Sequence, residues 1–179
     1  MAPDGENGRG INAVRLLSKI DKISIDELIQ LGYNKHLVAF DILLPSFLTY
    51  TQTIALKDKE KKAINYLTLW NRDASVNSIA TTIAIEWANL WSKEIPAAKT
   101  EEATTQIIKK YEQMVTEVSD EKKLSLLNTA LTQLETTYGN WEIPWGDINR
   151  YQRVNPGESM NDNAPSWAVG QTSSKWGSL

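Results

Sequence analysis

Apolar side chains recur at steps of three and four residues along most of this chain, and this spacing restricts what it can fold into. Leu124, Leu127, Leu131 and Leu134 show the pattern most plainly, because residues so spaced lie on one face of a helix. Before residue 141 there is no convincing alternation of apolar and polar residues, which would be typical of a half-buried strand. The pattern therefore predicts a mainly α-helical chain with about six or seven helices.

Several helix ends are marked by residues that suit such positions. Ser24 and Glu27 match a capping box, which predicts a helix start, and Gly32 predicts the end of that helix. Pro45 is expected to end or kink the helix before it. Residues 1–9 show no apolar period and predict a loop. The remaining ends are predicted at Ser75 or Asn77 (a start), Pro96 (an end), Thr100 with Glu101 and Glu102 (a start) and Gly139 (a left-handed stop).

The sequence changes character at Trp141. Residues 141–179 contain three of the six prolines and four of the nine glycines, and they show no helical period. A stretch of nearly 40 residues without regular structure is unusual inside a compact domain. We therefore expect a helical domain over residues 1–140 and an extended, irregular C-terminal tail over residues 141–179 that packs on another part of a larger protein.

Composition excludes several classes of function. The chain has no cysteine and a single histidine, so disulfides, thiolate nucleophiles, cysteine-bound zinc and histidine pairs are all ruled out within it. A net charge of −3 gives no basic footprint for nucleic acid, and no apolar run approaches the roughly 20 residues of a membrane span. No cofactor or metal site is expected in this chain.

Two groups of residues have both an ordinary and a functional interpretation. His36 lies among apolar residues of helical spacing, where a surface or capped position is commoner than a catalytic base. Trp87 and Trp91 are four residues apart and share a helix face, which favours core packing over stacking on a ligand.

Five stretches, taken in order, carry a resemblance to a known family: NGRGINAVRLL (residues 7–17), LLPSFL (43–48), LWNR (69–72), YGNW with WGDINR (138–150) and SKWGSL (174–179). Together they resemble the penicillin acylase family of N-terminal-nucleophile amidohydrolases, and most closely its acyl-homoserine-lactone acylase-like branch. Asn71 departs from the family pattern, because an aspartate is usual there.

The resemblance implies a parent enzyme with a four-layer αββα sandwich, whose precursor cuts itself to expose a serine, threonine or cysteine. That residue attacks the amide carbonyl with its own α-amine as base, while an asparagine and a backbone N–H stabilise the oxyanion. In family order the nucleophile and the asparagine precede Met1, and later core strands follow Leu179. The chain then corresponds to the helical insertion of the large subunit, with no catalytic residue of its own and no expected activity in isolation.

One supporting residue is implied within the chain. An arginine soon after the oxyanion asparagine braces the floor of the active site in the family, and by position it corresponds to Arg9, with Arg15 as the alternative. The implied partners are the small subunit, the sandwich core and a small-molecule N-acyl substrate, such as a β-lactam side-chain amide or an N-acyl-homoserine lactone. The resemblance leaves open a structural calcium in the parent and implies a periplasmic or secreted enzyme.

A different class of protein also fits the absence of catalytic groups: a free-standing helical interaction module without catalysis. The long tail disfavours this alternative, because such a module has no need of an irregular segment with four tryptophans.

Overall fold

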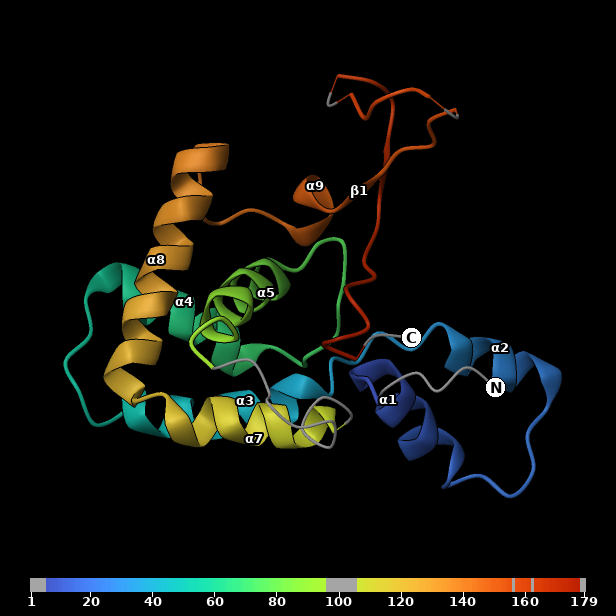
Figure 1. Cartoon of the computed structure of the whole chain (residues 1–179), viewed down its shortest axis with the longest axis horizontal. Helices are drawn as coiled ribbons and strands as arrows, with labels where there is room; N and C mark the ends of the chain where they lie inside the picture. The colour runs from blue at the N-terminus through green and yellow to red at the C-terminus, as the bar shows by residue number, and fades with distance from the viewer. Residues whose placement is uncertain (1–5, 96–105, 156, 162, 178–179) are drawn as a thin grey trace.

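The computed structural model describes residues 6–95, 106–155, 157–161 and 163–177, and this part of the chain is mainly helical, as predicted (Figure 1). The helices are α1 (Gly8–Leu17), α2 (Ile25–Gly32), α3 (Ala39–Thr51), α4 (Asp58–Leu69), α5 (Ile79–Trp91), α7 (Ile107–Glu117), α8 (Asp120–Tyr138) and α9 (Trp145–Ile148). Two short strands, β1 (Arg150–Tyr151) and β2 (Trp167–Ala168), pair antiparallel. Within the described ranges, no helix combines the length and the apolar character that a membrane span requires.

Helices α3, α4, α5, α7 and α8 form a body around one hydrophobic core, with α5 near its centre (Figure 1). Helix α5 is apolar on nearly all sides, which is typical of a helix surrounded by others. Trp87 and Trp91 on α5 are fully buried, and their ring centroids are 5.0 Å apart. Their indole N–H groups donate to the carbonyls of Lys123 and Met114. The interpretation of these two tryptophans as core residues is confirmed.

The predicted caps at both ends of α2 and at the end of α8 are confirmed. Ser24 and Glu27 form the full capping box, and α2 ends at Gly32. Gly139 ends α8 with φ of 77°, a left-handed conformation that costs a glycine little because it has no Cβ. The residues Pro96, Thr100, Glu101 and Glu102, at which other helix ends were predicted, lie outside the described residues.

Three predicted boundaries are wrong. Helix α1 begins at Gly8, inside the predicted loop, because the side chain of Asn7 caps it by accepting from the N–H of Gly10 at 2.9 Å. Helix α5 is capped by Ser78, which accepts from the N–H of Thr81, whereas Ser75 belongs to the turn just before it. Helix α3 continues through Pro45 instead of ending there.

Burial explains why α3 continues past its proline. A proline inside a helix costs about 3 kcal/mol, since it removes one backbone hydrogen bond and crowds the preceding turn. Leu43, Leu44 and Phe47 on either side of Pro45 are fully buried in the core. Burying each such side chain stabilises the fold by about 1.5–3 kcal/mol, which together outweighs the loss.

The segment after α8 returns across the body and contains regular structure that the sequence did not predict, α9 and the β1–β2 pair. Trp141, Trp145 and Trp176 are buried in the core, so much of the segment packs on the helices of this same chain. The backbone N–H of Gly146 donates to the carbonyl of Val76 at 2.7 Å. Beyond α9, the β1–β2 region projects away from the body at the upper right of Figure 1.

Candidate functional site

The first helix and the last described residues of the chain meet beside the start of α3. The backbone N–H of Arg9 donates to the carbonyl of Ser174 at 3.1 Å, and that of Ala39 donates to the carbonyl of Trp176 at 3.2 Å. Gly8 and Gly177 touch so closely that a Cβ on Gly8 would lie 3.0 Å from the Cα of Gly177. We call this meeting of residues 8–9 with 174–177 the junction.

Arg9, the predicted supporting residue, therefore lies at the junction, in the first turn of α1. Its side chain is partly exposed and has an interaction partner. Arg15, the alternative, lies two turns further along α1 and points to a different place, a group of charged side chains at the start of α3. The role of either arginine in bracing an active site stays a prediction.

That group of charged side chains is centred on Asp41, in the first turn of α3, and we call it the Asp41 cluster. The carboxylate of Asp41 accepts from Arg72 Nη1 at 2.7 Å and lies 3.0 Å from His36 Nε2. Arg15 Nη1 is more distant, at 3.4 Å. Three segments far apart in the sequence, α1, α3 and the turn after α4, are thereby tied together.

His36 is more constrained than its sequence context suggested. Its side chain is 17% exposed, its Nδ1 lies 3.5 Å from the carboxylate of Asp73, and its backbone forms an isolated bridge with that residue. Arg72, between the helices, has φ of 67°, and its carbonyl accepts from the N–H of Leu37. The expectation of a surface or capped histidine was wrong, because two carboxylates orient this ring from opposite sides.

The turn that carries Arg72 and Asp73 is stabilised by the residue that departs from the family pattern. The side-chain oxygen of Asn71 accepts from the N–H of Asp73, and its Nδ2 donates to the Asp73 carboxylate, each at 3.0 Å. Trp70 Nε1 donates to the carbonyl of Asp73 at 3.0 Å. Asparagine at position 71 thus builds a local turn of the kind that asparagine and aspartate both favour.

The electrostatics of the Asp41 cluster favour a fixed ion pair. Burial raises the pKa of Asp41, but hydrogen bonds and charge from His36 and Arg72 outweigh it and hold the pKa below its ordinary value. In the part of the chain that the structure describes, no three side chains are placed to hold a metal ion. None of the hydrogen-bond partners of His36 is a serine or threonine hydroxyl, so the geometry gives no nucleophile and base pair. The cluster is suited to holding segments together.

A comparison with protein families yields one match. A family model described as penicillin amidase matches residues 3–176. The matched range includes every helix and strand of the structure and both sides of the junction.

Proposed function

Because the chain belongs to the penicillin amidase family, we propose that it is the helical segment of a larger amidohydrolase that cleaves N-acyl amides. The resemblance carried by the five motifs is thus confirmed for the family. The finer assignment, to the acyl-homoserine-lactone acylase-like branch, belongs to this proposal. So do the substrates, which we propose are β-lactam side-chain amides or N-acyl-homoserine lactones.

The observation that best supports an inserted segment is the junction. Residues 9 and 174 are hydrogen-bonded to each other although the whole helical body lies between them in sequence. A segment with adjacent entry and exit fits into a host fold without pulling the flanking strands of that fold apart. In this proposal the sandwich core and the small subunit lie next to the junction, where Arg9 contacts the floor of the active site.

The chemistry of the proposed parent is acyl transfer to an N-terminal hydroxyl or thiol, with the α-amine of the same residue as base. A bond forms between nucleophile and acyl carbon, the amine leaves with a proton, and water then releases the acid. These groups are proposed to come from the rest of the enzyme. The hydrogen bonds of His36 to Asp41 support this division, since they engage the ring within the Asp41 cluster.

We therefore predict that the isolated chain hydrolyses no amide above background, whereas the complete gene product does. Loss of a nucleophile typically removes several orders of magnitude from the rate of such an enzyme. The test is to incubate both proteins with a chromogenic phenylacetyl amide and a long-chain acyl amide and to follow product release. Turnover by the isolated chain that survives further purification, and that His36→Ala abolishes, would contradict the prediction. A complete product without turnover would favour a non-catalytic helical module.

A further inference from the structure

A second group of side chains, separate from the Asp41 cluster, surrounds the amine of Lys175 near the end of the chain. Lys175 Nζ donates to the hydroxyl of Ser92 at 2.8 Å and lies 4.3 Å from the ring centroid of Trp176. The hydroxyl of Ser92 in turn donates to the carbonyl of Asn89, in the last turn of α5. Both Ser92 and Lys175 are partly buried. The amine is thus held in place on α5 by a neutral hydroxyl and an aromatic ring.

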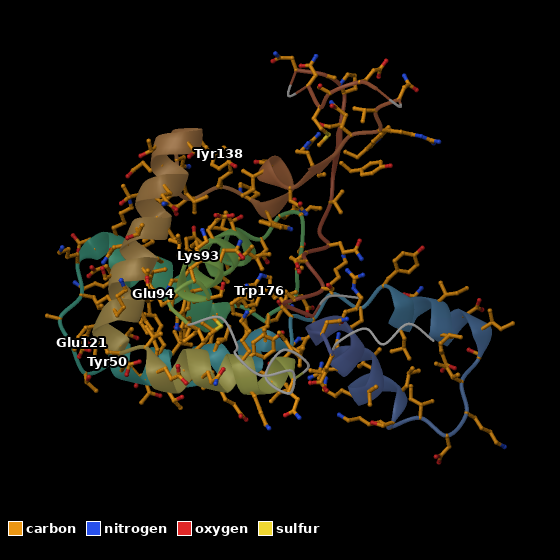
Figure 2. The ribbon with its side chains drawn as sticks, viewed as in Figure 1. Tyr50, Lys93, Glu94, Glu121, Tyr138 and Trp176 are labelled. Atoms are coloured by element: carbon orange, nitrogen blue, oxygen red, sulfur yellow. The ribbon has the colours of Figure 1, made fainter. Side chains whose placement is uncertain are left out.

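Two more lysines adjoin this amine from separate helices. Lys93 directly follows Ser92, and Figure 2 shows it beside α5 in the same part of the molecule as Trp176. Lys110 directly precedes Tyr111 on α7, and the hydroxyl of Tyr111 donates to the backbone carbonyl of Lys175. Contacts on both sides of Lys175 therefore bring Lys93 and Lys110 toward it.

The carboxylates near this group do not pair with Lys175. Glu86, on α5, acts on Lys93, and Glu6 acts on Tyr111. Among the described residues, the ion pairs of lysine are made at other positions, such as Lys59 with Glu135. Burial, then the charges of Lys110 and Lys93, lower the pKa of Lys175 to about 8. The three ammonium groups repel one another and lack an anion between them.

We propose that Lys93, Lys110 and Lys175 form a binding site for a small oxyanion, namely a carboxylate or phosphate group, with Ser92 beside it. Each ammonium group has three donors and no acceptor, and the oxygens of such an anion only accept, so the two sets are complementary. A bound anion also relieves the repulsion among the three cations. This site requires neither the amide chemistry nor the family assignment, and its test is independent of both.

Side-chain NMR of isotopically labelled lysines in the intact chain tests the proposal. Separate titrations with sodium phosphate and sodium acetate at pH 7 should shift the Lys175 signal saturably in at least one arm. Phosphate alone would identify a dianion site, and acetate as well would identify a carboxylate site. Lys59 should stay unchanged, because Glu135 already lies 2.6 Å from its amine. Absence of saturation in both arms, or an equal shift at Lys59, would overturn the site.

Variants keep the test sharp. Lys93→Gln, at an exposed position, should weaken anion binding about threefold to tenfold, whereas Lys59→Gln should leave it unchanged. Circular dichroism verifies that both variants are folded. Binding should also weaken as the pH rises through about 8, where the Lys175 amine loses its proton. Affinity that is equal in both variants and constant between pH 7 and 9.5 would show that these lysines are not the site.

Discussion

Asp41 is the single side chain on which most other charged groups near the junction depend. It lies in the first turn of α3, where a carboxylate also complements the positive end of the helix dipole. Arg72 and His36 each direct a nitrogen at it, at 2.7 and 3.0 Å. Removing its charge therefore leaves two partly buried groups without their anion, which costs more than the loss of one exposed ion pair.

We predict that Asp41→Asn lowers the free energy of unfolding at pH 7 by about 1–3 kcal/mol, from the loss of charged hydrogen bonds at a carboxylate 29% exposed. Urea denaturation measures it. The pKa of Asp41 is lowered in the fold, so the stabilisation is present above the unfolded value of 3.8 and disappears below it. The difference between variant and parent chain should shrink accordingly in acid.

The matched control for this prediction is Asp58→Asn. Asp58 pairs with Lys61 at 3.5 Å on the surface, and its side chain is fully exposed. This change should alter stability little, because exposed ion pairs are weak. Equal effects of the two substitutions would mean that the Asp41 cluster contributes no more than a surface pair.

The segment after α8 is attached to the body largely by close backbone contacts at two glycines. A Cβ on Gly146, in α9, would lie 2.8 Å from the Cβ of Val76 and 3.0 Å from its carbonyl oxygen. A Cβ on Gly170 would lie 3.0 Å from the carbonyl oxygen of Ala74. Residues 74–76 are thus covered from two directions, and the turn of Arg72 and Asp73 is fixed beside them.

Gly146→Ala should lower the thermal midpoint of unfolding, with a loss of about 1–3 kcal/mol from overpacking. Alanine is the better helix former, but the clash involves backbone atoms of Val76 that lie in a bonded turn and have little room to move. Gly32→Ala, in α2, meets nothing within 4 Å and should be neutral or slightly stabilising. Thermal denaturation followed by circular dichroism compares them. A neutral Gly146→Ala would mean that this contact is loose.

Local sequence signals predicted the helices well and their connections poorly. The stripe of leucines in α8 and the caps at Ser24 and Gly139 depend on neighbours within a few residues, so they were legible. The continuation of α3 past Pro45 depends on burial against other helices, which periodicity does not report.

The Asp41 cluster and the junction were not predictable for a related reason. His36 acquires its carboxylate partners through the fold, because Asp73 comes from the turn after α4, far along the sequence. No spacing rule links position 9 to position 174 or position 92 to position 175. Family resemblance supplied Arg9, and only coordinates place its backbone beside Ser174.

For the molecule as a whole, Trp176 connects the end of the chain to the body. Its side chain is 1% exposed, and its ring lies 5.9 Å from that of Phe40 and 6.3 Å from that of Tyr111. Gly8 is buried against the residue that follows it, Gly177. Helix α1 makes little contact with the other helices, so its position depends on this distant segment.

Trp176→Ala should cost about 3–5 kcal/mol, as expected for removing a large buried ring, and should also loosen α1. Hydrogen exchange read by mass spectrometry should show faster exchange over residues 9–17, although the change lies at the other end of the sequence. Trp167→Ala is the control, because Trp167 is 63% exposed in β2. Unchanged protection of α1 in Trp176→Ala would show that α1 is held by the Asp41 cluster alone.

The dependence of α1 on Gly177 sets an order of events during synthesis. Residues 8–17 leave the ribosome long before residues 174–177, yet they complete their burial only when the later segment arrives. Closing so long a loop is also entropically costly, which makes it a late step. Helix α1 is thus made early and docks late. Throughout that interval Val14 and Leu17, exposed even in the finished fold, stand open to other nascent chains and to chaperones.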